Sequence, residues 1–421
     1  MNIQAKPQLT LAETSLVDAF TARVAELPGD GALMLARDHA IERIKAGLPN
    51  RRVEAWHYTD LRRLLTAVPD YDPAAKAEVV PPLLAGSLVL PVLGGRTADV
   101  KGVDGLVVRR VEELLGEGAL NDFLAPVDAA DAIGAMNAAF AADGVSVDVA
   151  AGAALETPLE IQNVHAGGQT HTRHVVNVGA GARAVFVERQ TGTADALVSS
   201  VSHLAVADDA EVLWVILQEQ PTGASYLGQF NATIGRNGKL TLFVMNEGGK
   251  LVRQEIRVAA AGEGGVFTLR GANLLAGETH CDVTMVLDHA GHGASSTEIV
   301  RNVVLDRAHG VFQGQIRVAR EAQKTDAKMA CNTLLLSDEG DFSIKPELEI
   351  FADDVACGHG ATVAEIDANH LFYLMARGIP EKEARGLLVK AFLAEVVEDL
   401  RNEALVDALE AKLDAWFVEH G

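Results

Sequence analysis

Two residues near the C-terminus, Cys357 and His359, have the side chains and the spacing to hold a transition metal. One residue separates them, so in an extended segment both side chains project to the same side. Cysteine thiolate and imidazole both ligate iron well. The neighbouring Gly358 and Gly360 would let a cluster or another backbone approach closely. On spacing alone a glycine turn is the stronger interpretation, and two residues cannot complete a cluster site.

A second group of candidate ligands consists of His280, Cys281, His289, His292 and His309. They would form a metal site if neighbouring chain segments stacked these side chains together. Cys281, however, alternates with apolar residues of its own run, which is where a core cysteine would lie. We therefore expect core or turn positions for this group rather than metal ligation.

Signatures of familiar enzymes are missing from the sequence. It contains no GxxxxGK[ST] loop for nucleotide phosphates, no GxSxG, no HExxH and no EF-hand loop. The adjacent pair Asp353 and Asp354 is poorly arranged for paired acid catalysis, because neighbouring residues of a strand point to opposite faces. We expect a solvated turn there, and we expect any ATP hydrolysis to come from a partner.

Composition and charge narrow the class of protein. Hydrophobic residues make up 48% of the chain and aromatic residues only 5%, which favours a core of small side chains. The net charge of −22 makes nucleic-acid binding improbable, because such a surface repels phosphate. Basic or neutral proteins are better partners, although the plainer interpretation is that the acidity keeps the protein soluble.

The cysteine content and the N-terminal segment predict a cytoplasmic protein. Cys281, Cys331 and Cys357 are too few and too widely spaced for a disulfide framework. Cys331 lies in an apolar run and is expected in the core. Residues 1–20 lack the charged start and apolar run of a signal peptide, and no stretch approaches the ~20 apolar residues of a membrane span.

From about Val145 onward, the chain that would position these residues consists of short β-rich runs. The runs that start at 266, 283, 299 and 311 begin 12 to 17 residues apart, as expected of repeated β-structure. Turn residues such as 179–181, 237–238 and 262–265 separate them. The runs are 159–164, 174–178, 184–188, 212–218, 240–245, 266–269, 283–287, 299–305, 311–318, 334–336 and 342–350.

Two features of these runs favour a solenoid. Val212–Leu217 is apolar on both faces, as in strands that are covered on two sides. The run 311–318 instead alternates cleanly, with Phe312, Ile316 and Val318 on one face. No helical pattern intervenes for about 200 residues, which argues against a βαβ sheet. A β-helix fits, although the pattern alone leaves a sandwich or a jelly roll nearly as good an interpretation.

Helical patterns flank the β-rich body. Leu16, Phe20, Val24 and Leu27 form an amphipathic stripe, and further helices are expected over 32–46 and 131–141, with a strand over 87–93. At the other end, Asp367 can cap a helix that stops at Gly378, Pro380 opens a second helix, and a third carries leucines at i+4 steps. The expected organisation is a helical region (1–70), a mixed α/β connection (71–144), a β-helix core (145–362) and a helical domain (363–421).

Four blocks of the C-terminal half resemble the SufB/SufD family of the SUF iron–sulfur cluster assembly system. They are KTDAKMACNTLLL (324–336), IKPELEI (344–350), ACGHGAT (356–362) and YLMARGI (373–379). The segment EAWHYTDL (54–61) is similar to the SufD type of that family rather than the SufB type. The resemblance covers most of the chain and is weakest between about 70 and 150.

The resemblance implies a mainly β fold: a right-handed parallel β-helix flanked by helical domains. It implies a non-enzymatic scaffold subunit that pairs with SufB through the β-helix ends and binds the SufC ATPase through its C-terminal helices. His359, with Cys357 beside it, would be a candidate cluster ligand at the SufB interface. The family has a serine where this chain has Gly358. Candidate SufC-docking residues are Leu387, Leu388, Phe392 and Val396.

The resemblance assigns the chain no cofactor of its own. A nascent cluster shared with SufB, a reduced flavin in the complex, and a homodimer in the absence of partners all stay open. Two other functions also stay open. A SufB-type scaffold would be expected to carry more cysteines, and a β-helix carbohydrate enzyme would be expected to carry a secretory signal and acids clustered on one face.

Overall fold

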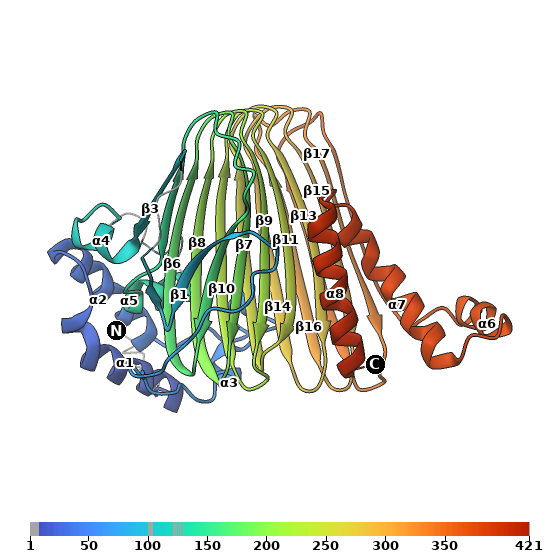
Figure 1. The fold of residues 1–421 in the computed structure, drawn as a ribbon, viewed down its shortest axis with the longest axis horizontal. Coiled ribbons are helices and arrows are strands. Elements are labelled where there is room, and N and C mark those ends of the chain that lie inside the picture. The colour runs from blue at the N-terminus through green and yellow to red at the C-terminus, as the bar shows by residue number, and fades with distance from the viewer. Residues whose placement is uncertain are drawn as a thin grey trace, which may run out of the picture.

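The structure, a computed structural model, describes residues 8–99, 104–120, 124, 126, 128 and 130–420. Residues 1–7 of the expected N-terminal region and residue 421 of the expected C-terminal domain lie outside the described residues. Figure 1 shows one long β-body, with helices packed beside its N-terminal half and a second group of helices at its C-terminal end.

The N-terminal helices form where the sequence provides caps. Thr10 and Glu13 make a capping box, with the Glu13 amide donating to Thr10 Oγ1 at 3.2 Å. The expected stripe from Leu16 to Leu27 is divided between an α-helix and a 3₁₀ turn. The helical elements up to residue 140 are α1 (Leu11–Arg23), η1 (Val24–Glu26), α2 (Gly31–Lys45), η2 (Glu54–Trp56), α3 (Leu61–Leu64), α4 (Val111–Gly116) and α5 (Ala132–Phe140).

The described residues form nineteen strands, of which those over 196–206, 225–234 and 251–260 were not among the expected runs. They are β1 (Leu88–Leu93), β2 (Arg96–Thr97), β3 (Leu106–Arg110), β4 (Val145–Val149), β5 (Leu159–His165), β6 (Gly168–Val178), β7 (Arg183–Gly192), β8 (Ala196–Val206), β9 (Glu211–Gln220), β10 (Ser225–Ile234), β11 (Lys239–Gly248), β12 (Leu251–Ala260), β13 (Val266–Leu275), β14 (His280–His289), β15 (Ser295–Val304), β16 (His309–Val318), β17 (Asp326–Leu335), β18 (Asp341–Ile350) and β19 (Ala356–Ala364).

The strands stack into a parallel β-solenoid, which confirms the β-helix interpretation over the sandwich and the jelly roll. The odd-numbered strands other than β3, together with β2, make a ten-stranded sheet, and the even-numbered strands from β4, together with β3, make a nine-stranded sheet. Successive strands of the chain therefore alternate between the two sheets. Leu251, His280 and His309 lie side by side in register, so these coils are 29 residues long. Only the pairs β1–β2 and β3–β4 are antiparallel among the described residues.

One apolar core fills the space between the two sheets. Phe312, Ile316 and Val318 face it, as their alternation predicts. Turn residues repeat at one edge, where Gly181, Asp209 and Asn237 all adopt positive φ. Each of the three donates its amide to a carbonyl of the next coil, at 2.9, 2.8 and 2.8 Å. Glycine, aspartate and asparagine adopt this conformation most easily, which explains the turn residues that punctuate the sequence.

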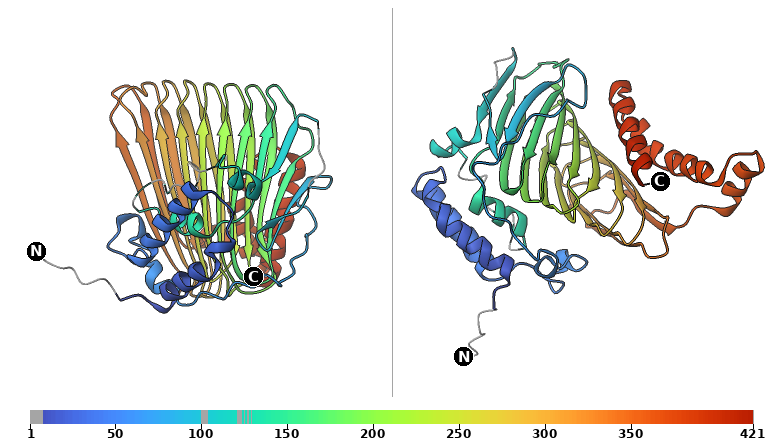
Figure 2. Two further views of the ribbon diagram at one scale, coloured as in Figure 1. Left: turned by 90° about the vertical axis from the view of Figure 1, so that its left-hand side faces the viewer. Right: turned by 60° about the horizontal axis from the view of Figure 1, so that its bottom comes forward.

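Helices cover the outer faces of both sheets (Figures 1 and 2). The N-terminal helices pack on the even-numbered strands through a second apolar cluster, which includes Leu197, Leu227 and Leu251. The C-terminal helices are α6 (Ala368–Ala376), α7 (Glu381–Glu398) and α8 (Glu403–His420), and α7 and α8 pack on the odd-numbered strands through a third cluster. No described helix is both long enough and apolar enough to span a membrane.

Candidate functional site

The C-terminal coil of the solenoid, formed by β18 and β19, is the part of the β-body that remains uncovered. Each strand has a β-sheet neighbour on one side only, β16 for β18 and β17 for β19. In β19 every residue is exposed except Cys357, which is half-buried. The large apolar residues Ile350, Phe351 and Val363 are also exposed here. A strand pair that stops without a cap leaves both main-chain hydrogen-bonding groups and side chains open to a partner.

Cys357 and His359 both lie on β19, so the interpretation of their segment as a glycine turn is wrong. Cys357 pairs in register with Ala327, and His359 with Met329. Their spacing places both side chains on one face of the strand, and Cys357 packs against the edge of the solenoid core. Partial burial raises the pKa of the Cys357 thiol, while a hydrogen bond from the Ala327 backbone opposes this.

The two glycines beside these residues leave the strand open. A Cβ atom built on Gly358 or Gly360 would meet nothing within 4 Å. No contact inside the chain therefore requires glycine at either position. The opposite face of β19 is consequently flat backbone, which another chain or a cluster could approach closely.

The other two cysteines are sealed in the core, as predicted. Cys281 and Cys331 are both 1% exposed. Burial raises the pKa of Cys281 far above its ordinary value and that of Cys331 to about 12. The Asn302 side-chain amide donates to Cys331 Sγ at 3.3 Å. Since the thiolate is the metal-binding form, neither cysteine is available to a metal in this fold.

The histidines of the second group occupy strand and turn positions. His280 contacts Thr59, with 2.9 Å between Nε2 and Oγ1, and its ring stacks on His309. His289 is buried, and His292 is an exposed turn residue. Over the described residues, no three His, Cys, Asp or Glu side chains are grouped closely enough to hold a metal ion. Asp353 and Asp354 lie in the turn before β19, where Asp354 pairs with Lys324, as expected of a solvated turn.

The four candidate docking residues on α7 face different environments. Val396 is fully buried against the solenoid, so its selection as a docking residue is wrong. Phe392 is partly buried beneath the Arg301 guanidinium, 5.3 Å from its ring centre. Leu388 is half-buried, and Leu387 is 45% exposed. The i+4 apolar pattern identified an amphipathic helix, but most of its stripe meets the protein's own sheet.

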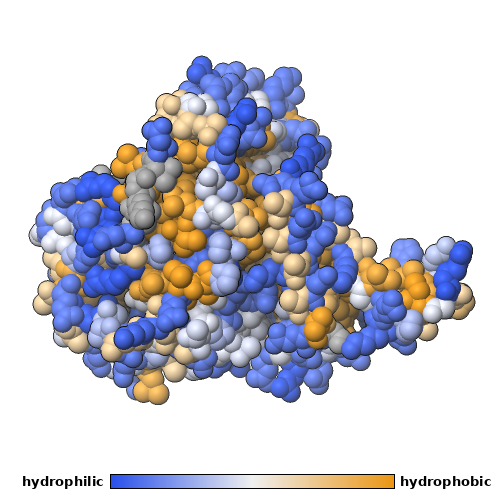
Figure 3. All heavy atoms as spheres, in the orientation of Figure 1, coloured by the Kyte–Doolittle hydropathy of each residue, from blue (hydrophilic) through white to orange (hydrophobic). Residues whose placement is uncertain are grey.

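An exposed apolar surface lies instead on α6, for which the sequence pattern predicted a helix but no docking role. None of its residues is buried, and Phe372 and Tyr373 are 72% and 58% exposed. In Figure 3 hydrophobic side chains gather on this lobe, which extends away from the β-body. Gly378 adopts a φ of +87° in the turn between α6 and α7. The signal in the sequence was the aromatic pair within the run Leu371–Met375.

The segment Glu54–Leu61 attaches the N-terminal helices to the even-numbered strands. Trp56 is fully buried and lies 4.4 Å from the Arg253 guanidinium. Arg253 donates to the Ala55 carbonyl at 2.8 Å and pairs with the buried Asp282. Thr59 donates a short hydrogen bond to the same Asp282 carboxylate. A buried ion pair that also bonds the Ala55 carbonyl and the Thr59 hydroxyl fixes how the helices sit on the sheet.

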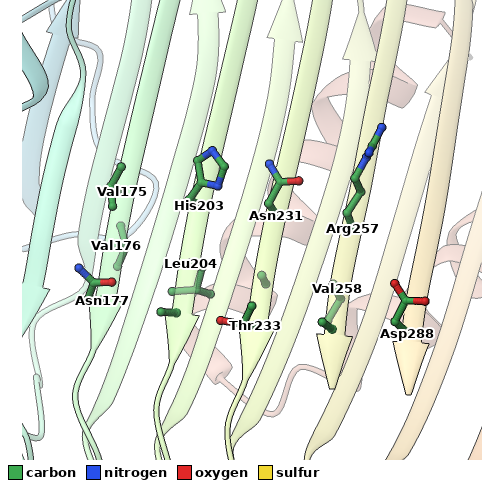
Figure 4. Close-up of a pocket in the computed structure, with 13 residues that line it drawn as sticks. Val175, Val176, Asn177, His203, Leu204, Asn231, Thr233, Arg257, Val258 and Asp288 are labelled. Carbon is green, nitrogen blue, oxygen red and sulfur yellow. The ribbon is translucent and has the colours of Figure 1, made fainter. Parts of the chain in front are cut away.

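A shallow groove of about 450 Å³ on the outer face of the even-numbered strands is less suited to chemistry (Figure 4). Its walls are mostly Val, Leu and Ala side chains from β6, β8, β10 and β12. Arg257 is held there by Asp128 and Glu255, at 3.0 Å each. No cysteine lines this groove, in contrast to the terminal coil with Cys357.

Comparison with known proteins gives one consistent result. Residues 159–392 match the family described as "SUF system FeS cluster assembly, SufBD core domain". The chain is 27% identical over 392 residues to iron–sulfur cluster assembly protein SufD of Escherichia coli K12, covering 90% of this chain and 91% of that protein. It is 30% identical over 291 residues to SufD of Bacillus subtilis, covering 66% of each chain. It is also 28% identical over 383 residues to a SufBD family protein of Mycobacterium tuberculosis H37Rv, covering 87% of this chain and 90% of that protein.

Proposed function

Because the chain belongs to the SufBD family of the SUF iron–sulfur cluster assembly system, we propose that it is the SufD-type scaffold subunit of a SufB–SufC–SufD complex. In this role it pairs with a SufB-type chain through its terminal coil. It also docks a SufC-type ATPase through its C-terminal helices. The chain itself catalyses no reaction, and the cluster is cargo that is assembled at the interface.

The bare terminal coil is the observation that carries this proposal. Cys357 and His359 are the cysteine and histidine that this coil offers to a partner, and both residue types ligate iron. Two ligands do not complete a cluster site, so the remaining ligands have to come from the chain that covers β18 and β19. The exposed Ile350, Phe351 and Val363 give that chain an apolar surface on which to pack.

The surface proposed for the ATPase moves from the middle of α7 to α6 and the first turns of α7. Phe372, Tyr373 and Leu387 supply exposed apolar contacts there, with Leu388 at the edge. Val396 and Phe392 instead hold α7 on the solenoid. Ion pairs of α7 with the sheet, Arg301–Glu395 and Arg270–Asp399 at 2.5 Å each, reinforce that attachment. A load applied at α6 would therefore be transmitted to the solenoid through a firmly attached helix.

The proposal includes a cytoplasmic setting and no cofactor resident in this chain. All three cysteines are free, which suits a reducing compartment. ATP hydrolysis is assigned to the partner. A reduced flavin, if the complex uses one, is assigned to the assembled complex rather than to this chain.

Co-expression with candidate SufB-type and SufC-type chains tests the proposal. After anaerobic purification, we expect a complex of all three chains that contains iron and sulfide. Failure of this chain to co-purify with a SufB-type chain would refute the scaffold assignment.

The docking surface is tested separately by Phe372→Ser with Tyr373→Ser, which should abolish retention of the ATPase while the SufB-type chain stays bound. Truncation after Gly378 should have the same effect. The matched control is Leu11→Ser, because Leu11 is 82% exposed at the opposite end of the molecule. Full retention of the ATPase by the double variant would place its docking surface elsewhere.

A further inference from the structure

Glu298 is a carboxylic acid in the interior of the solenoid, close to its open end. It lies on β15 and is fully buried. Its inward-facing register partners in the preceding coils are Leu242 and Leu269. In the following coils the same column continues through Met329 and ends at His359. Glu298 is thus the one acid in this stretch of an otherwise apolar column that leads to the candidate site.

Neither carboxylate oxygen of Glu298 has a hydrogen-bond partner. The Ser296 hydroxyl on the same strand face and the Glu298 backbone amide lie near the carboxylate and lower its pKa, as the charge of Arg270 does, yet Ser296 is already bonded to His289 Nε2 at 3.0 Å. His289 Nδ1 is buried without a partner as well. An ionised carboxylate cannot persist in such surroundings, so the side chain is uncharged in the empty protein. Consistently, burial raises the pKa of Glu298 to about 8.

Packing gives no reason for an acid at this position. Leucine or methionine occupies the equivalent place in the neighbouring coils, so an apolar side chain of similar size fits the column. A buried polar group without partners lowers stability, by a factor of roughly 5 to 150 in the folding equilibrium for each unmet hydrogen bond. Glu298 therefore weakens the fold, and a role outside packing accounts for it.

The position of Glu298 relative to the site supplies that role. Strand β17 separates it from β19, so it is two strand spacings, roughly 10 Å, from His359 and does not touch Cys357 or His359. The intervening residue below Cys357 is only an alanine, Ala327. Charge on Glu298 raises the pKa of the Cys357 thiol, although less than burial does, so the two groups interact electrostatically through the interior.

We propose that Glu298 is the interior counter-charge of the site at Cys357 and His359. It carries a proton while the site is empty and releases that proton to solvent when a metal cation binds. The resulting carboxylate balances part of the added positive charge. This inference rests on the proposed function of Cys357 and His359 as ligands, and it makes Glu298 a positioning residue rather than a ligand.

Among the groups around this part of the interior, Glu298 is the one suited to act as the counter-charge. On its own strand the inward neighbour is Ser296. The strands beside it contribute Leu269 and Met329 on the interior face, with Arg270 on the outer face of β13. His289 reaches the same corner through Ser296, and burial lowers its pKa to about 4. The charged groups that act on Cys357 are Asp326 on β17 and Glu298 on β15.

Binding of Co²⁺ to the full-length chain tests the inference. Calorimetry in buffers of different ionisation enthalpy counts the protons released per metal ion, and the Co²⁺–thiolate absorption reports ligation by Cys357. We expect the wild type to release roughly one proton more per Co²⁺ at pH 7 than Glu298→Gln, and to bind Co²⁺ about tenfold more tightly at pH 8. Glu339→Gln is the matched control, because Glu339 is exposed in the turn before β18.

The variants separate this inference from the proposed function. If Cys357→Ala and wild type bind Co²⁺ identically, the assignment of Cys357 as a ligand fails, and the inference fails with it. If binding depends on Cys357 but Glu298→Gln releases as many protons as wild type, the inference alone is wrong. Glu298→Leu repeats the measurement with an apolar side chain. Failure of both Glu298 variants to fold would show that the acid is structural and would overturn the inference.

Discussion

The covered middle of the solenoid and its bare terminal coil are built from the same repeat but differ in what surrounds them. In the middle, Phe243 on β11 is fully buried beneath α7 and α8, and Leu227 on β10 is fully buried beneath the N-terminal helices. In the terminal coil, β19 has no covering element and is exposed along nearly its whole length. The repeat alone therefore does not determine function. Reactive side chains become available only where the covering helices stop.

The three cysteines show this difference most clearly. Cys281 and Cys331 occupy inward positions of strands that have neighbours on both sides, and both are sealed. Cys357 occupies an inward position of the terminal strand, in register with Ala327, and is only half-buried. A residue type that is core in one coil becomes a candidate ligand in the terminal coil because the next coil is absent.

The largest effect that we predict is in thiol reactivity. In the folded chain Cys357 should react with iodoacetamide at least about a thousand times faster than Cys281 or Cys331, since the latter two react only after the structure opens. Peptide mapping by mass spectrometry, with quenching at a series of times, gives the three rates. Comparable rates for Cys331 and Cys357 would mean that the coils before the terminal one are open as well.

Truncating an aromatic residue should change the free energy of unfolding much more in the covered middle of the solenoid than in its terminal coil. Trp214 is fully buried, stacks on Phe186 at 4.8 Å and donates to Glu188 at 3.2 Å. We predict that Trp214→Ala lowers the free energy of unfolding by about 3–5 kcal/mol, through the cavity and the lost hydrogen bond. Phe351→Ala in the isolated chain should change it by less than about 0.5 kcal/mol, since Phe351 is 66% exposed. Urea unfolding measures both changes, and similar losses would contradict an open terminal coil.

Two ion pairs beside the segment Glu54–Leu61, one buried within the even-numbered strands and one exposed, offer a similar contrast. Asp282→Ala leaves the buried Arg253 guanidinium without its main partner, and should cost about 3 kcal/mol. Glu54→Ala removes an exposed partner of Lys345 at 3.1 Å near the terminal coil, and should cost less than about 0.5 kcal/mol. Both values come from urea midpoints at constant m. A small loss for Asp282→Ala would show that the segment Glu54–Leu61 does not anchor the helices.

A smaller effect of opposite sign is expected at Glu298. Replacing it by leucine should raise the free energy of unfolding by about 1–3 kcal/mol at pH 4.5 and below, where the acid is protonated in the folded chain, because a buried polar group without partners is removed.

The pH dependence of this gain has a definite sign. The pKa of Glu298 is raised from 4.5 to about 8 in the folded chain, so between these values the folded state holds a proton that the unfolded state has lost. Wild-type stability should therefore fall, relative to Glu298→Leu, by up to about 1.4 kcal/mol per pH unit as pH rises through this window. The difference should be constant below pH 4.5 and again above pH 8. A pH-independent difference would mean that folding does not shift the pKa of Glu298.

The sequence predicts the elements of this fold better than their pairing. Alternation within the run 311–318 correctly identifies the inward face, but alternation does not distinguish a parallel solenoid from a sandwich, because both bury one face of each strand. The family resemblance of the blocks from Lys324 onward decided between them. Residues 237–238 could be recognised as a turn because the positive φ of Asn237 restricts the choice of residue.

The candidate site was predictable in part and for similar reasons. Cys357 and His359 could be selected because the resemblance places them, whereas their strand conformation depends on pairing with β17, which local spacing does not encode. Val396 was misassigned because an apolar stripe does not reveal whether it meets the protein's own sheet or a partner. Glu298 was missed because a single acid between apolar runs looks like a turn residue until the register places it inside.

We propose above that His359 on the bare terminal coil contributes to holding a nascent cluster. The most direct test is the iron and sulfide content of the anaerobically purified complex that carries His359→Ala, with His292→Ala in an exposed turn as the control. We predict an intact complex with about tenfold less iron and sulfide for His359→Ala, and wild-type content for the control. An intact His359→Ala complex with undiminished iron and sulfide would contradict the claim.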